Sequence, residues 1–469
     1  MNNDQQSVLY ITIDSIRADR VGFVGDHRDT TPFMNELADN GTTFEHAIAN
    51  GIPTYYSFKS LLGGIHSLSH EEGIGLPDSA VSIAEVFRQQ GYSTAGFNAK
   101  NPWLTEAYQY DRGFDVFRDF TSTDDARLNP GRLTQKLKRF AKRSVSFSDV
   151  LTDRLGQLGR MTNALLDSQP LTPAEPLTEA ASQWLETRSS NDPFFLWVHY
   201  MDPHYPWIPP AEFLPADAEF TRLEIGRLWH TVAHEYKKEN ASIDDETVAQ
   251  ISQLYDAEIR RTDAAIRRLV STLKEQDAFE NTLIAIAGDH GTELHDHGGF
   301  SHGPDTLYQE VIHVPLLFHG PDVGQATRGV AALVDVPQTI VNSVSEIQAS
   351  PDSFEGMDLF ETKRQGVSTE VVYDYDPALG ENTDNDVLQA RTEPPWKLVR
   401  NQHTGSIELY DIEADPEEQQ LIQGEDEKRS MLQSELDSHR EFILRRNRTI
   451  AEKRRIRERI AELRQEGKI

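Results

Sequence analysis

The chain has 469 residues, enough to bury a large core, and its 76 Asp+Glu against 46 Lys+Arg give a formal charge of −30. This acidic balance argues against general nucleic-acid binding, and the absence of cysteine excludes disulfides, thiolate metal sites and a cysteine nucleophile. An acidic surface that prefers Arg to Lys is typical of proteins that stay hydrated in concentrated salt, so we expect a halophilic protein.

The N-terminal residues lead directly into a short apolar run at 8–13, without a basic region before it. No stretch of about 18 apolar residues occurs anywhere in the chain. These features predict a cytoplasmic protein with neither a signal peptide nor a transmembrane segment.

Short apolar runs then alternate with helical patterns. The runs that predict buried strands are 8–13, 93–98, 193–200 and 282–291, and the longest helical pattern covers 256–276. This alternation predicts an α/β fold around a mainly parallel, buried sheet. Ligands bind beyond the carboxyl ends of the strands in such sheets, so the site residues should follow these runs directly.

Three later parts of the chain depart from this pattern. Residues 120–180 are polar and loosely patterned, and we interpret them as an insertion or lid in a catalytic domain that spans 1–365. Residues 366–425 contain short strand and turn signals, which predict a small antiparallel subdomain. Residues 426–469 predict a long C-terminal helix, for which docking on its own domain is favoured over formation of a homodimer.

Metal-binding residue types follow two of the predicted strands. Asp14 ends the first strand, and Asp289 and His290 follow the run that starts at 282, with further histidines close behind. A lone Asp-His pair is more often a turn with a hydrogen-bonded histidine, but a distant carboxylate joined to such a pair suits a hard or borderline divalent cation. We therefore predict one divalent metal ion, Ca, Mg, Mn or Zn, bound by these three residues.

Four stretches of the sequence resemble the sulfatase family of the alkaline-phosphatase-like superfamily. They are VLYITIDSIRADRVGF with its following T-P-x-x-x-x-L-A-x-x-G element, LWVHYMDPHYPWIPP, IAGDHGTELHDHGGFSHGPDTLYQE, and WKLVRN with ELYDIEADPEEQ. They occur in the order of the family and span nearly the whole chain. The resemblance implies an alkaline-phosphatase-like three-layer sandwich with Asp14, Asp289 and His290 as metal ligands. Ser15 stands where many sulfatases carry a second Asp, which implies one metal with fewer carboxylates.

The nucleophile position is the main departure from the family. Sulfatases place a Cys or Ser, oxidised to formylglycine, at the head of C/S-x-P-x-R-x-x-L-x-x-G. Alignment of the Leu61-Leu62-Gly63-Gly64 stretch puts Thr54 at the head and Phe58 at the Arg position. The family's formylglycine chemistry starts from Cys or Ser, so we expect no modified nucleophile. An unmodified Thr resembles the phosphodiesterase and phosphoglycerol-transferase branches of the superfamily.

A threonine hydroxyl is a poor nucleophile unless a base or a metal activates it, so Thr54 is expected to be a metal ligand as well. The alternative is that Thr54 caps the following helix, because Thr is favoured at that position. Ser57 is the alternative nucleophile.

The resemblance also implies roles for residues around the nucleophile and the metal. His204 and His302 are expected to contact the ester oxygens and to protonate the leaving group, and His297 to contact substrate or to orient a metal ligand. Candidates for substrate binding, two of which could replace the missing Arg, are Lys59, Lys100 and Asn101. Structural roles are expected for His199, behind the site, and for Asp263, in an ion pair.

Together these features predict a metal-dependent hydrolase or transferase that acts on phosphate or sulfate esters through a covalent Thr54 intermediate. The substrate would be a small molecule, a glycan or a lipid headgroup. Two alternatives stay open: a sulfuric ester hydrolase, arylsulfatase-like, with an unmodified nucleophile, and a non-catalytic protein that binds an anionic glycan or lipid headgroup.

Overall fold

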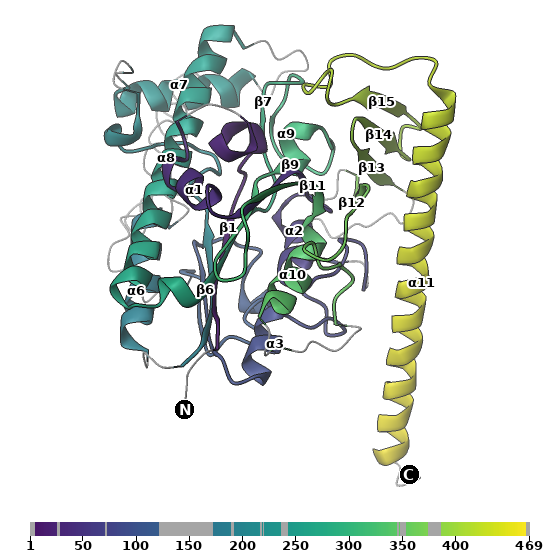
Figure 1. Ribbon diagram of the computed structural model, residues 1–469. Coiled ribbons are helices and arrows are strands. Elements are labelled where there is room, and N and C mark those ends of the chain that lie inside the picture. Colours follow the sequence, from purple (N-terminus) through teal and green to yellow (C-terminus); the bar gives the residue numbers. More distant parts are fainter. Residues whose placement is uncertain are drawn as a thin grey trace, which may run out of the picture.

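The computed structural model describes residues 5–465 except 26–28, 71–72, 122–171, 189–191, 216–217, 219, 236–242, 345–346, 348–352 and 374–385. Figure 1 shows a large sheet covered by helices, beside a small sheet along which the C-terminal helix runs. Residues 122–171, which make up most of the insertion predicted at 120–180, lie outside the described residues.

The large sheet has the strand order β11-β2-β10-β6-β1-β5-β3-β4, and β9 pairs with β2. Its centre is parallel, since β1 pairs in parallel with both β5 and β6, and β5 pairs in parallel with β3. Antiparallel β10 lies between β6 and β2. The strands are β1 (Ser7–Ile13), β2 (Thr42–Ile48), β3 (Ser93–Asn98), β4 (Val116–Arg118), β5 (Phe194–Tyr200), β6 (Thr282–Gly288), β9 (His313–Val314), β10 (Leu316–His319) and β11 (Ala326–Ala332).

Helices cover both faces of this sheet (Figure 1). Alternate residues of β1 point to opposite faces, so Val8 and Tyr10 pack in one core while Leu9 and Ile11 pack in the other. Burial on both faces explains why the strand has a continuous apolar sequence instead of an alternating one. The helices are α1 (Pro32–Ala38), α2 (Thr54–Leu61), α3 (Ile83–Gln89), α6 (Ala174–Thr187), α7 (Arg222–Glu235), α8 (Asp245–Glu275), α9 (Gln309–Ile312) and α10 (Val336–Ser343).

The C-terminal part contains the antiparallel sheet β12-β13-β14-β15 and the helix α11 (Asp426–Gln465). Its strands are β12 (Val367–Val372), β13 (Val387–Glu393), β14 (Trp396–Asn401) and β15 (Ile407–Asp411), and a further short pair is β7 (Glu293–Leu294) and β8 (Phe300–Ser301). Leu432, Leu436 and Ile443 of α11 are fully buried, and Arg446 forms an ion pair with Glu355 of the large domain. The helix therefore docks on its own chain, and dimerisation through it stays a prediction.

The predicted fold class is confirmed, including the small antiparallel sheet and the long final helix. No helix among the described residues is long and apolar enough to cross a bilayer. One smaller expectation needs correction. Asp263 of α8 forms no ion pair in the described structure and instead accepts hydrogen bonds from the backbone N–H groups of Phe33 and Met34, 2.9 and 2.8 Å away. It thereby caps the N-terminus of α1, where unpaired N–H groups favour a carboxylate.

Candidate active site

Four parallel strands deliver the candidate residues to one edge of the sheet. Because β6, β1, β5 and β3 are neighbours in this order, their carboxyl ends lie side by side. Backbone hydrogen bonds continue the pairing past the strands, from Asp14 N to Tyr200 O at 2.9 Å and from Asp289 N to Ile13 O at 3.1 Å. The edge therefore places residues from four distant parts of the sequence around Asp14.

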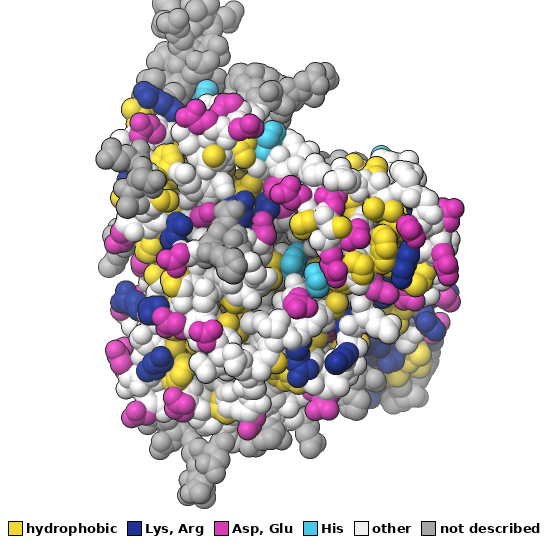
Figure 2. Space-filling view, turned by 45° about the horizontal axis from the view of Figure 1, so that its top comes forward, with side chains coloured by type: hydrophobic (Ala, Val, Ile, Leu, Met, Phe, Trp, Pro, Cys, Tyr) yellow, Lys and Arg dark blue, Asp and Glu magenta, His cyan; other side chains and the backbone are white. Residues whose placement is uncertain are grey.

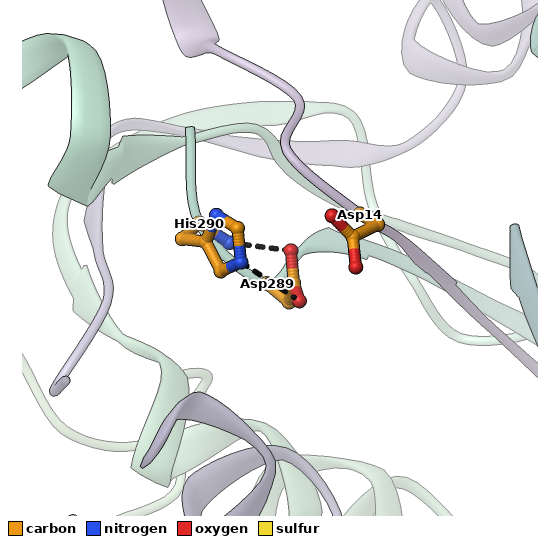
Figure 3. A group of neighbouring side chains, drawn as sticks. All are labelled: Asp14, Asp289 and His290. Carbon is orange, nitrogen blue, oxygen red and sulfur yellow. Dashed lines mark hydrogen bonds and ion pairs between the residues drawn. The ribbon is translucent and has the colours of Figure 1, made fainter. Parts of the chain in front are cut away.

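Asp14, Asp289 and His290 meet at this edge, as Figure 3 shows. Each offers one ligand atom, and these atoms all lie within 4.8 Å of one another. All three side chains are fully buried. The Asp289 carboxylate also accepts hydrogen bonds from the N–H groups of Ser15 (3.1 Å) and His290 (2.7 Å), which fix its orientation.

The donor atoms fit a divalent cation. Nδ1 of His290 lies 2.8 Å from the carbonyl oxygen of Gly291, which can only accept, so Nδ1 carries the hydrogen and Nε2 presents a lone pair toward the carboxylates. Oδ2 of Asp289 is buried without a hydrogen-bond partner among the described residues. A bound cation would satisfy both atoms, and buried lone pairs without such a partner are costly.

The pKa shifts of the two carboxylates also favour a bound cation. Burial raises the pKa of Asp289 well above its ordinary value, and the neighbouring charge of Asp14 raises it further. Burial opposes ionisation of Asp14 too, but His204, His199 and His290 around its carboxylate lower its pKa well below the ordinary range. Two buried acids in contact push their pKa values apart, and a cation between them would keep both ionised.

The glycine after His290 is required by packing. A Cβ atom at Gly291 would lie 2.0 Å from the carbonyl oxygen of Glu310, so any other residue would push apart the strand end and α9. The Asp-His-Gly sequence thus combines two candidate ligands with a close backbone approach.

The Thr54 hydroxyl joins this cluster. Its Oγ1 lies 3.2 Å from Oδ2 of Asp14 and 3.2 Å from Nε2 of His290. Thr54 is the first residue of α2, and the N-cap is Pro53, which makes no side-chain cap hydrogen bond within the described structure. The helix-cap interpretation of Thr54 is therefore wrong. Oγ of Ser57 instead donates to the backbone carbonyl of Thr54, at 3.3 Å, which turns it toward its own helix.

Two further side chains hold Asp14. The Ser15 hydroxyl donates to Oδ1 at 2.6 Å, and the Asn101 amide donates to Oδ2 at 3.1 Å. The amide of Asn101 is oriented because its oxygen accepts from Trp103 N, so its NH₂ group also faces Thr54 at 3.5 Å. The sequence suggested Asn101 only as a substrate contact, and gave no signal for the Ser15 hydroxyl beyond its place after Asp14.

His204 and His302 lie beside the cluster. The ring centre of His302 is 4.3 Å from that of His290 and 5.0 Å from that of His204. Nδ1 of His204 lies 2.6 Å from the carbonyl oxygen of Tyr205, which leaves Nε2 as the atom that exchanges a proton. Burial lowers the pKa of His302 well below its ordinary value, and the charges of His290 and His204 add to this effect.

The residue at the family's Arg position and the two lysine candidates lie on α2 and directly after β3. Phe58, at the family's Arg position, is fully buried, with its ring against His199, Trp197 and Tyr110. Lys59 is buried on α2, and Lys100 follows β3 in a left-handed backbone conformation with φ 67°. The substrate-binding roles of both lysines stay predictions.

His297 contacts a different group of residues. Its Nδ1 lies 2.7 Å from Oε1 of Glu310, its ring stacks on Tyr308 with centres 3.7 Å apart, and its Nε2 approaches the carbonyl oxygen of Glu418 at 3.4 Å. Its hydrogen bonds within the described structure thus tie the large domain to the C-terminal part, and none of them reaches Asp14, Asp289 or Thr54. A role for His297 in catalysis stays a prediction.

The face drawn in Figure 2 carries histidine side chains near its middle, and Lys and Arg are scattered among Asp and Glu around them. This distribution differs from the continuous basic surface that a nucleic acid requires.

Comparison with known proteins identifies the family of the chain. The sequence model of the Sulfatase family matches residues 6–345. An arylsulfatase of Clostridium perfringens is 23% identical over 467 residues, which cover 93% of this chain and 95% of the relative. A multifunctional alkaline phosphatase superfamily protein of Trinickia caryophylli is 22% identical, with 90% of this chain and 92% of the relative covered.

Solved structures show the same fold. The phosphonate monoester hydrolase of Agrobacterium radiobacter superposes with a TM-score of 0.67 at 16% identity, covering 94% of this chain and 96% of its own. The match of the family model over more than half of the chain shows that the protein belongs to the sulfatase family of ester hydrolases.

Proposed function

We propose that this sulfatase-family hydrolase cleaves phosphate or sulfate esters by direct attack of the unmodified Thr54 hydroxyl, with formation of a covalent threonine ester. The observation that carries the proposal is the position of Oγ1 of Thr54, 3.2 Å from both Asp14 and His290. A hydroxyl without a functional role would not be expected to converge with three buried metal-ligand atoms at a strand edge.

Each residue of the site has a separate role in the proposed reaction. A divalent cation bound by Asp14, Asp289 and His290 would lower the pKa of the Thr54 hydroxyl and offset the charge of the ester. Asp14 accepts a hydrogen bond from Thr54 and is the nearest carboxylate to receive its proton. Attack at phosphorus or sulfur breaks the bond to the departing alkoxide, and His204 supplies the proton that this oxygen needs. His302, whose pKa lies well below its ordinary value, is placed to contact the ester oxygens instead.

Release of the product requires a second displacement. Water, or the hydroxyl of an acceptor in a transferase, attacks the threonine ester, and the histidine that lost its proton accepts one from the attacking oxygen. Such a two-step reaction restores Thr54 at the end of each cycle.

The substrate class follows from two opposing observations. Membership of the sulfatase family favours a sulfate ester, whereas an unmodified Thr in place of formylglycine favours a phosphoester, and we place the phosphoester first. Among the relatives, one is named an arylsulfatase and one solved neighbour a phosphonate monoester hydrolase, so both chemistries occur on this fold. An arylsulfatase with an unmodified nucleophile is the second candidate.

The test uses purified full-length protein in high salt with Mn, Mg, Ca or Zn. Aryl sulfate, phosphate monoester and phosphodiester are assayed in parallel, and rapidly quenched protein is examined by intact mass spectrometry. We expect turnover of a phosphoester and one phosphoryl group attached to Thr54. Turnover of the sulfate ester alone would replace our first candidate with the second. Metal binding without turnover of any ester would support the non-catalytic binding protein instead.

A further inference from the structure

His199 lies directly behind the proposed metal site and has no role in the mechanism proposed above. It is the sixth residue of β5, its side chain is fully buried, and its Nε2 lies 3.6 Å from Oδ2 of Asp14. This Nε2 has no hydrogen-bond partner among the described residues. A buried nitrogen so close to a candidate ligand is either a ligand itself or a donor to that ligand, and its protonation decides which.

A chain of buried hydrogen bonds determines that protonation. The indole Nε1 of Trp197, which can only donate, lies 3.0 Å from Oγ1 of Thr12. The same Oγ1 lies 2.9 Å from Nδ1 of His199. Thr12 is fully buried, so its single hydroxyl hydrogen needs an acceptor, and Nδ1 of His199 is the acceptor beside it. With Nδ1 accepting, the neutral ring carries its hydrogen on Nε2.

We propose that His199 is a positioning residue that presents Nε2–H to Oδ2 of Asp14 and holds this carboxylate in the orientation that binds the cation. The hydrogen on Nε2 excludes His199 from the metal ligands, in contrast to His290, whose Nε2 is unprotonated. The proposal rests on the proposed metal site, but its tautomer can be measured without metal.

The surroundings of the ring support this role. Phe58 meets the ring edge to face with centres 4.9 Å apart, and Trp197 stacks on it with centres 6.1 Å apart. These contacts restrict rotation of the imidazole, so Nε2–H stays directed at Asp14. The aromatic residue at the family's Arg position thus has a local function, which is to support His199.

The Nε2–H group of His199 would gain Oδ2 of Asp14 as its hydrogen-bond acceptor when a cation binds. In the described structure Oδ2 of Asp14 already accepts hydrogen bonds from Thr54 and Asn101, and the 3.6 Å separation from Nε2 exceeds hydrogen-bond range. A cation held by the proposed ligands would withdraw the Thr54 hydrogen from Asp14, and this would leave a position on Oδ2 for the hydrogen on Nε2 of His199. Outer partners of this kind contribute about 10–100-fold to metal affinity.

The tautomer is tested first, in metal-free protein labelled with nitrogen isotope in its histidines. The His199 ring signal is assigned as the one that disappears in His199→Gln. A long-range proton–nitrogen spectrum should show Nδ1 unprotonated and Nε2 protonated. A ring protonated on Nδ1, alone or together with Nε2, would overturn the proposal.

Metal affinity is then measured by competition of Mn²⁺ with a chelator. His199→Leu should weaken binding by about 10–100-fold, whereas His199→Gln, whose amide nitrogen reaches about as far as Nε2, should retain most of it. Thr12→Val should weaken binding and Thr12→Ser should not. Equal affinity of His199→Leu and wild type overturns the proposal, as does equal weakening by Leu and Gln.

Two controls separate the possible failures. Thermal unfolding of each variant, with and without metal, shows whether a loss of affinity comes from a damaged fold. A purely structural role would lower the unfolding midpoint equally in both conditions. If wild-type protein binds no Mn²⁺, Mg²⁺, Ca²⁺ or Zn²⁺, the proposed function fails, while the tautomer measurement still decides the assignment of His199.

Discussion

The protein contains two carboxylate–histidine groups of similar composition, and they differ in how their lone pairs are used. Asp14, Asp289 and His290 form the first, and Glu293, His297 and Glu310 form the second; in each, the candidate ligand atoms lie within 4.8 Å. In the first group, Oδ2 of Asp289 has no hydrogen-bond partner within the described part of the chain, and His290 directs a lone pair inward. In the second, His297 points its Nδ1 at Glu310, 2.7 Å away.

Hydrogen bonds from the backbone add to this difference between the two groups. Oε1 of Glu293 accepts hydrogen bonds from the N–H groups of His297 and Gly299, so the loop itself satisfies the carboxylate. Residue type and proximity therefore do not identify a metal site. What distinguishes the first group is buried acceptor capacity that the protein leaves unused, together with a hydroxyl placed to be activated.

The largest expected effect concerns that hydroxyl. Thr54→Ala should reduce kcat by at least about a thousandfold, the scale of losing a nucleophile, while Thr54→Ser keeps a hydroxyl and a measurable part of the rate. Steady-state kinetics on the preferred ester measures this. Near-normal activity of the alanine variant would remove the covalent mechanism and leave only the metal site.

Metal binding should separate the two groups next. Asp289→Asn keeps the shape and the acceptor oxygen of the side chain but removes its charge, so we expect metal affinity to fall by more than about 100-fold, beyond the loss of an outer partner. Glu293→Gln is the matched control in the second group, and should leave one ion per chain in elemental analysis after dialysis. Two ions per wild-type chain would show that both groups bind metal.

The second group should instead contribute to the free energy of unfolding of the protein. Glu310→Gln removes a charge-assisted hydrogen bond to His297 and should lower the free energy of unfolding by about 1.5–3 kcal/mol near pH 6. Burial lowers the pKa of His297, but the hydrogen bond and charge of Glu310 outweigh it, so the net pKa is raised. This stabilisation is complete below the unfolded-state pKa of about 6.5 and is lost as pH rises through the folded-state pKa.

Chemical denaturation of metal-free wild type and Glu310→Gln, at pH about 6 and about 9, gives the comparison. The difference between the two proteins should shrink at the higher pH. A difference of the same size at both pH values would mean that His297 is neutral in the folded protein and that its link to Glu310 carries no charge.

The smallest effect is expected at the rim of the second group. Gln419 is exposed, and its amide donates to the carbonyl oxygen of Asp296 at 3.2 Å beside His297. Gln419→Ala should change the free energy of unfolding by less than about 0.5 kcal/mol, because both partners can bond water instead. A larger loss would show that the Gln419 amide contributes to the stability of the contact between the large domain and the C-terminal part.

Much of the fold could be predicted because it depends on local sequence. The continuous apolar runs at β1, β5 and β6 predicted buried parallel strands, and the rule that ligands bind at strand ends predicted that Asp14 and Asp289 lie together. The structure brings them together with His290 and Thr54, as expected. The roles of these residues are the proposals that the experiments above address.

Other features depended on contacts that no local pattern encodes. Asp263 sits in the middle of α8, where an ion pair was the expectation, and its use as a cap for α1 depends on how two distant helices pack. Thr54 had the residue type of a helix cap, but its hydroxyl lies at the strand edge because α2 begins at the carboxyl ends of β1 and β6.

The sequence by itself determined the α/β class, the family and the residues at the strand ends, because apolar periodicity and motif order are properties of the chain. Only the tertiary structure decided which lone pairs remain open, since hydrogen bonding is settled by neighbours far apart in sequence. His290 and His297 have the same side chain and are seven residues apart, yet Nε2 of His290 faces two carboxylates and the Thr54 hydroxyl, whereas Nδ1 of His297 is bonded to Glu310.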